Sequence, residues 1–120
     1  MGTSYVEQGD RAKQVLESLL EDAVADGADS IDLEYVSDGL EVTFMFGNSG
    51  IGSVVDDRIL AGELIRLIVE RAKLQNRSRG MINWTYHGKS HNITVVEYEN
   101  FNESAFRLIL DDSRGYLLNM

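Results

Sequence analysis

The chain of 120 residues has the length of one domain, and a domain of this size buries roughly two thirds of the surface that its unfolded chain exposes. It contains no cysteine, which excludes disulfides, iron-sulfur clusters, zinc thiolate sites and cysteine nucleophiles. Its net charge of -9 disfavours nucleic acid as a partner, because phosphate neutralisation needs a basic surface. We therefore expect residues 1–120 to form a single domain that binds no nucleic acid.

The negative charge is concentrated toward the N-terminus. Residues 1–41 contain eleven acidic and two basic residues, whereas the rest of the chain carries nine of each. Six basic residues cluster in one later segment: Arg58, Arg66, Arg71, Lys73, Arg77 and Arg79. This asymmetry predicts an acidic end and a mildly basic second helix.

The first residues, MGTSYVEQGD, do not combine a basic region with a following apolar run, as a secretory signal would. The apolar stretches are also far shorter than a membrane span. We expect a cytoplasmic protein without a membrane span.

The first predicted element is a helix from Asp10 to Asp26. Apolar residues recur there at intervals of three and four, which lines one face of a helix. Asp10 is a candidate N-cap and Gly27 a candidate C-terminal stop. Ser4 and Glu7 form a capping-box pattern that would start the helix earlier.

Two strands follow the first helix. Residues 30–36 and 40–46 alternate apolar and polar side chains, and the turn at 37–39 predicts an antiparallel hairpin. The next segment has Gly47 and Gly52 at the spacing of a phosphate-binding loop, but the lysine and hydroxyl that should follow are missing. We interpret these glycines as a turn that leads from the sheet into a helix.

The second half of the chain predicts one helix and three strands. Apolar residues at helical spacing extend over residues 56–77. Strand patterns then cover 81–87, 91–99 and 104–110, with a turn at 88–90, and residues 115–120 could add an edge strand or a helical tail. The order α-β-β-α-β-β-β predicts an α+β fold, with an antiparallel sheet of about five or six strands and two helices packed on one face.

Candidate chemistry is sparse. His87 and His91 flank one turn, but two imidazoles without a nearby carboxylate make a poor metal site, so a solvated strand end is the better interpretation. Asp29, Asp32 and Glu34 could form a carboxylate cluster, although the alternation favours an acidic outer face.

No serine, threonine or lysine has a recognisable orienting base, so no catalytic residue, cofactor site or metal site is assigned. Trp84 and Tyr86 lie two apart on one predicted strand. They could belong to the core or form an exposed aromatic strip.

Four motifs in order carry a family resemblance: GADSIDLEY, VTFMFGN, NRSRGMI and NESAFRLIL. They resemble the GASDIHIEP, vRfRidG, RlPQDGri and GExvvlRiL segments of the N-terminal PAS-like domain in hexameric ATPases of type II secretion and type IV pilus assembly. The order and spacing correspond over about residues 12–110. The resemblance implies a PAS-like arrangement, and it places residues 46–55 in the turn after the second strand.

The chain departs from the family pattern at several positions. Asp32 stands where the family has histidine, and Tyr35 replaces a proline. Thr43 and Met45 occupy the positions of two strand arginines. In the family, arginines of this domain can reach the nucleotide bound by the following ATPase domain, so these losses argue against intact nucleotide sensing.

The resemblance implies a stand-alone, non-enzymatic adaptor or regulator, since the sequence holds no ATPase domain. Arg77 and Gly80 are the remaining residues of the third motif, and Arg107 matches the final arginine. The expected partner is a secretion or pilus ATPase, its membrane platform, or a second copy of the chain. The candidate partner contacts are Arg77, Arg79, Arg107, Asp32 and Glu34.

Two alternatives stay open beside the adaptor. The size, acidity and mixed topology resemble small dimeric secretion chaperones, although the short C-terminal segment lacks the long helix with which these usually end. A PAS-type sensor would require a cavity for a small ligand. An enzyme ranks last, and the sequence leaves the partner, the oligomeric state and any bound ligand open.

Overall fold

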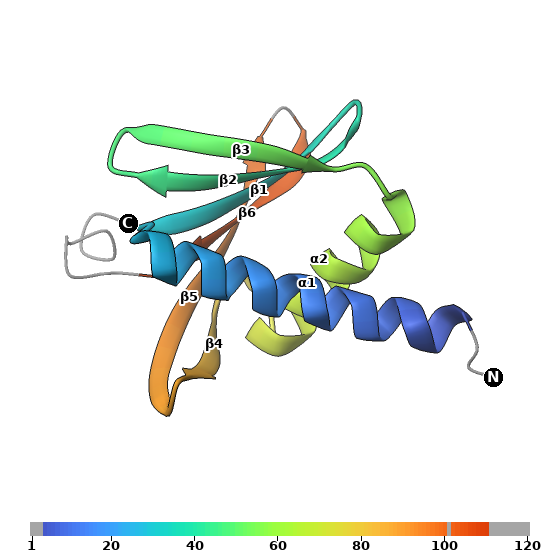
Figure 1. Cartoon of the computed structure of the whole chain (residues 1–120). Helices are drawn as coiled ribbons and strands as arrows, with labels where there is room; N and C mark the ends of the chain where they lie inside the picture. The colour runs from blue at the N-terminus through green and yellow to red at the C-terminus, as the bar shows by residue number, and fades with distance from the viewer. Residues whose placement is uncertain (1–3, 101, 111–120) are drawn as a thin grey trace.

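A computed structural model describes residues 4–100 and 102–110, with the backbone alone for residues 4–9. Two helices and six strands follow one another along this part of the chain (Figure 1). Their bounds are α1 Ser4–Asp26, β1 Ser30–Val36, β2 Gly39–Phe46, β3 Ser49–Val55, α2 Arg58–Ala72, β4 Arg79–Tyr86, β5 Lys89–Asn100 and β6 Glu103–Ile109. The predicted α+β class is confirmed, and the element order gains one strand.

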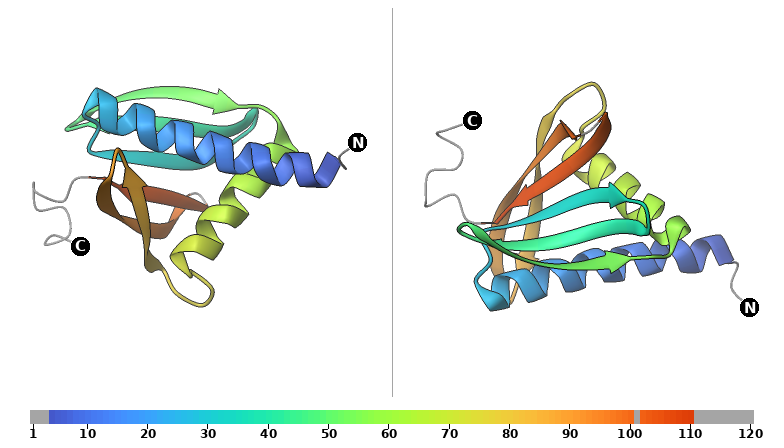
Figure 2. Two further views of the ribbon diagram at one scale, coloured as in Figure 1. Left: turned by 60° about the horizontal axis from the view of Figure 1, so that its bottom comes forward. Right: turned by 90° about the horizontal axis from the view of Figure 1, so that it is seen from above.

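The six strands form one antiparallel sheet in the order β3-β2-β1-β6-β5-β4. The first three strands and the last three form consecutive hairpins, and β1 joins these halves by pairing with β6. Both helices lie on one side of the sheet (Figure 2). The opposite face carries no helix from the described residues.

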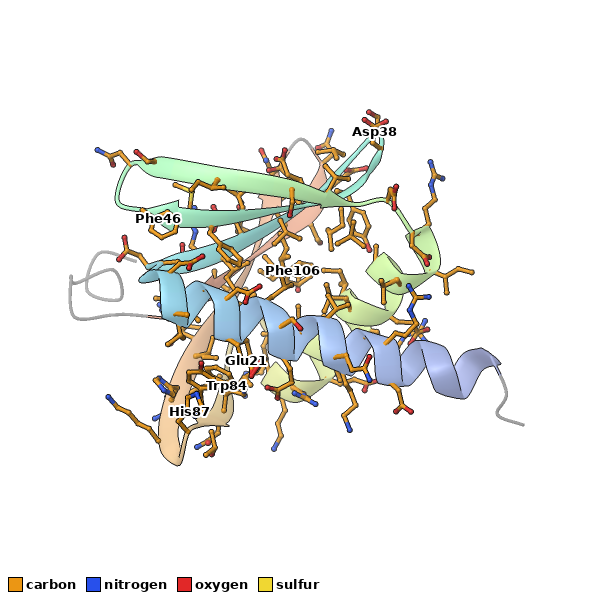
Figure 3. The ribbon with its side chains drawn as sticks, viewed as in Figure 1. Glu21, Asp38, Phe46, Trp84, His87 and Phe106 are labelled. Atoms are coloured by element: carbon orange, nitrogen blue, oxygen red, sulfur yellow. The ribbon has the colours of Figure 1, made fainter. Side chains whose placement is uncertain are left out.

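The core lies between the sheet and the two helices. Alternate strand residues such as Ile31 and Leu33 point into it, as period-two patterning requires. The helices contribute Leu16, Leu20, Leu64 and Ile68, each at most 1% exposed. Figure 3 shows Phe106 and Trp84 on this side of the sheet.

Helix α1 already includes Ser4, the first residue that the structure describes, so it starts well before Asp10. Asp10 lies within the helix and is not its N-cap. Gly27 ends the helix with a positive φ of 78°, as predicted. The Gly27 amide donates to the Val24 carbonyl at 3.1 Å, and the Ala28 amide donates to Ala23 at 2.9 Å, which is the Schellman arrangement.

The main correction concerns the glycine-rich segment. Residues 49–55 form strand β3, which pairs with β2, whereas the sequence predicted a turn leading directly into a helix. Only Gly47 and Asn48 form the turn, with Gly47 at a φ of 63°. Six of the seven β3 residues are exposed, so no alternation of apolar and polar residues marked the strand.

Helix α2 is shorter than the predicted span of 56–77. The Asp57 carboxylate caps it by accepting from the amides of Ile59 and Leu60, both at 3.1 Å. Lys73 ends it in the left-handed conformation. Arg77 therefore lies in the following loop, and the second helix carries only three of the six clustered basic residues.

The later strands agree with prediction to within two residues at every end. The turn between β4 and β5 is shorter than the predicted 88–90, because His87 and Gly88 form it and Lys89 and Ser90 belong to β5. The segment 115–120 lies outside the described residues. No helix among the described residues is long and apolar enough to cross a membrane.

Gly80 is where β4 passes closest to α2. A Cβ atom added there would overlap the backbone carbonyl of Ala72, whereas one added at Gly62 in α2 would meet nothing within 4 Å. We expect Gly80→Ala to lower the free energy of unfolding by about 1–3 kcal/mol, because the helix end and the strand would have to separate.

Gly62→Ala is the matched control. It should raise the free energy of unfolding by about 0.5–1 kcal/mol, since alanine is the better helix residue. Urea unfolding of both variants measures the difference. Equal stability of the two variants would contradict this account of Gly80.

Candidate functional site

Four of the five candidate contacts lie on the helix-free face. Asp32 on β1 pairs with Arg107 on β6, Arg107 pairs with Val96 on β5, and Val96 pairs with Arg79 on β4. Directly opposed residues of an antiparallel sheet point to the same side, so these side chains form one row. Glu34 is two residues from Asp32 and therefore shares its face.

The burial of neighbouring residues identifies this face. Ile31 and Leu33 flank Asp32 along β1 and are at most 1% exposed in the core under the helices. The side chain of Asp32 must therefore point away from the helices. The same alternation places Phe106 and Leu108 in the core and Arg107 on the helix-free face.

Asp32 and Arg107 form a two-pronged ion pair at the centre of the row. Arg107 Nε donates to Asp32 Oδ1 at 2.8 Å, and an Arg107 terminal nitrogen donates to Oδ2 at 3.0 Å. The Arg107 side chain is 39% exposed and the Asp32 side chain 19% exposed. Partial burial and the paired geometry make this contact stronger than an ordinary surface ion pair. Asp32 and Arg107, which were predicted to contact a partner, thus bind each other.

Tyr98 and Asn100 on β5 complete the polar network around this pair. The Arg107 guanidinium lies 5.9 Å from the Tyr98 ring centre, within cation-π range. The Glu34 carboxylate accepts from the Asn100 side-chain amide at 2.6 Å. Asp32 and Glu34 are therefore engaged within the sheet, and the predicted acidic outer strip is in fact a mixed, hydrogen-bonded network.

Burial raises the pKa of the Tyr98 phenol above its ordinary value of 10.0. The nearby carboxylates of Asp32 and Glu34 add to this increase in pKa, whereas the Arg107 charge opposes it. Tyr98 is therefore a neutral hydroxyl at physiological pH.

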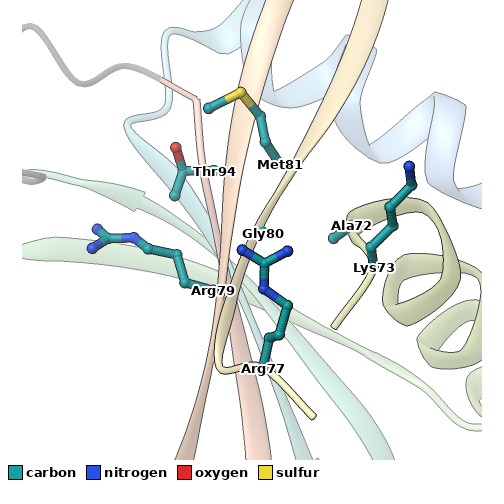
Figure 4. A pocket seen from close by; sticks show the side chains of 7 residues that line it. All are labelled: Ala72, Lys73, Arg77, Arg79, Gly80, Met81 and Thr94. Atoms are coloured by element: carbon teal, nitrogen blue, oxygen red, sulfur yellow. The ribbon is translucent and has the colours of Figure 1, made fainter. Parts of the chain in front are cut away.

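A basic groove lies between the C-terminal end of α2 and the first residues of β4 (Figure 4). Its volume is about 660 Å³, and three cationic side chains border it: Lys73, Arg77 and Arg79. Ala72, Gly80, Met81 and Thr94 line the rest. Three positive charges around a partly apolar hollow favour an anionic group with a carbon skeleton.

The groove connects the remaining candidate, Arg77, with the helix-free face. Arg79 belongs both to the groove and to the row that contains Arg107, and strand spacing puts their backbones about 10 Å apart. Lys73 was not among the residues singled out by sequence reasoning. Its only signal in the sequence was membership of the basic segment, because tertiary packing places β4 and β5 beside it to complete the groove.

Asp29 has a structural role. It is 2% exposed, and its carboxylate accepts from the Gly47 amide at 2.6 Å, which ties the β2–β3 turn to the start of β1. Asp29 therefore does not join Asp32 and Glu34 in a catalytic carboxylate pair, since those two side chains lie on the helix-free face.

The aromatic residues of β4 belong to the helix side. Trp84 is 4% exposed, and its indole nitrogen donates to Glu17 on α1 at 2.9 Å. Its ring stacks on Tyr86 at 5.0 Å, which supports the core interpretation. His91 lies against Trp84 and His87 against Tyr86. Within residues 10–100 and 102–110, no three acidic or histidine side chains are placed to hold a metal ion.

Comparison with known proteins adds no relative. No model of a known protein family matches the chain. A search of curated proteins finds no match either.

The Asp32–Arg107 pair generates the first prediction for this site. Arg107→Ala should lower the free energy of unfolding by about 1–2 kcal/mol, because it leaves a half-buried carboxylate without its two hydrogen bonds. Arg107→Lys should recover only part of this loss, since lysine lacks the planar fork. Chemical denaturation measures both, and equal stability of Arg107→Ala and the unchanged chain would contradict the role.

A second prediction concerns Tyr98. Asp32→Asn should lower the Tyr98 pKa, and Arg107→Ala should raise it, because these changes remove a negative and a positive neighbour, respectively. Ionising the partly buried Tyr98 phenol opposes folding. The stabilisation that the neutral phenol contributes is therefore complete below pH 10 and is lost as the pH rises through the raised pKa of Tyr98. Tyrosine ring carbon NMR during an alkaline titration follows both effects; shifts in the opposite directions would refute them.

Proposed function

We propose that this chain is a non-catalytic protein-interaction module, an adaptor or regulator related to the N-terminal domain of type II secretion and type IV pilus ATPases. The observation that carries the proposal is the gathering of the candidate contacts. Four of them share the sheet face that no described helix covers, and Arg77 borders the adjoining groove.

The composition of this face suits a protein partner. The charged row adjoins accessible apolar side chains, among them Met81, which is 53% exposed, and the partly buried Met45 and Val96. Apolar contact area combined with hydrogen-bonding charges is typical of protein interfaces. The three cations of the groove favour an acidic segment of the partner.

The position of the four motifs supports the family relationship. GADSIDLEY runs from the end of α1 through β1, and VTFMFGN covers β2 and its turn. NRSRGMI leads into β4, and NESAFRLIL forms β6. The helix, hairpin, helix and closing strand that these motifs mark in the ATPase family occur here in the same order.

A small anionic ligand is the second candidate, because the groove is large enough for a molecule as well as for a side chain. Such a ligand would make the chain a sensor. Binding of a small anion to the purified chain, with no partner protein in the reaction, would distinguish this function from the first.

We test the adaptor function by affinity capture from the cells that make the protein, followed by mass spectrometry. The unchanged chain should retain a secretion or pilus ATPase or its membrane platform. The double variant Arg77→Glu with Arg79→Glu should retain at least tenfold less of that partner, since two of the three positive charges of the groove are reversed.

Arg66→Glu is the matched control. Arg66 is exposed on α2, on the helix side of the sheet, and its charge change is of the same kind. It should retain the partner. Loss of the partner from the control alone would place the contact on α2, and capture of no such ATPase or platform would overturn the proposal.

A further inference from the structure

Strand β3 is an edge of the sheet without the usual protection. It pairs with β2 on one side and is the last strand in the order, so its outer backbone groups face away from the described strands. None of its seven residues is charged, and six are exposed. Ile51 is 69% exposed and Val54 is 45% exposed. A long, uncharged and apolar edge is a template for pairing with another strand.

The other edge of the same sheet is different. β4 begins with the charged Arg79, and the end of α2 packs on the core-side face of the strand at Gly80. Charge is one of the ordinary means by which proteins protect an edge strand. Of the two outer strands (Figure 1), β3 is therefore the one without a charged residue.

We propose that β3 pairs with β3 of a second copy of this chain, antiparallel and centred on Gly52, to give a continuous twelve-stranded sheet. The strand is complementary to its own reverse in side-chain size. In this register Ile51 lies opposite Ser53 of the other copy, and Val54 lies opposite Gly50. Each exposed apolar side chain thus meets a small one, and the two Ile51 side chains become diagonal neighbours on one face.

The charge distribution permits a second copy at this edge. The net charge of -9 opposes association of two chains, but none of the seven β3 residues is charged, so a β3–β3 pair brings no like charges directly together. The first acid beyond the strand, Asp56, would lie opposite the neutral Asn48 of the other copy. A single strand pair is a small interface, so the dimer should dissociate on dilution.

Cysteine crosslinking tests the register, because the chain contains no cysteine of its own. Gly52→Cys places two thiols opposite each other across the twofold axis, within disulfide range. Gly52 has no positive φ, and its new Cβ would meet only the Thr43 hydroxyl at 3.3 Å and a carbonyl at 3.7 Å. Ser49→Cys is the control, since its two thiols would lie roughly 20 Å apart in this register.

We expect mild oxidation to give a crosslinked dimer of Gly52→Cys at least tenfold faster than of Ser49→Cys. Equal rates would indicate random collision and would overturn the proposed pairing. This experiment uses the purified chain alone, so its failure is distinct from any failure to capture a partner protein.

Sedimentation equilibrium over a concentration series tests the dimer without crosslinking. Ile51→Lys should weaken dimerisation about tenfold or more, because it places two charges side by side at the edge. Ile59→Lys is the matched control on α2, where the side chain is 57% exposed, and it should leave the dimer unchanged. An unchanged chain that stays monomeric at millimolar concentration would overturn the proposal and leave this edge to a strand of another protein.

Discussion

The antiparallel pairing of β1 with β6 is the contact on which the rest of the fold depends. It lies in the middle of the sheet and joins the strands before α2 to those after it. Without it, each half would be a three-stranded sheet with an open edge in the core. The pairing also brings Asp32 to Arg107, 75 residues later, so the strongest polar contact of the helix-free face is a consequence of the central register.

Packing of both helices on one face gives the sheet two chemically different sides. The helix side takes most of the buried apolar residues of the strands. The other side keeps the alternate residues, where charges are paired across strands and apolar side chains remain accessible. Because the described helices cover one face of the sheet only, the other face presents side chains in a register that the strand pairing defines.

Several residues of the family-like motifs have a local structural reason. Gly27 closes α1, Asp29 holds the β2–β3 turn, and Gly80 lets β4 pass the end of α2. Arg107 forms an ion pair with Asp32. These contacts give each of the residues a local structural role, and Arg77 borders the groove as a candidate contact for a partner.

Periodicity in the sequence was sufficient to predict both helices, five strands and the α+β class, because it shows which residues of a segment face the core and which face solvent. It could not predict β3, because this strand contains two glycines and shows no alternation of apolar and polar residues. It favoured the core for Trp84 and Tyr86 but left an exposed aromatic strip open. Tertiary structure alone decided that Asp32 meets Arg107 and that Thr94 of β5 lines the groove beside the basic segment. The reason is that strand pairing is set between distant segments, whereas sequence patterns record only the side on which each residue lies.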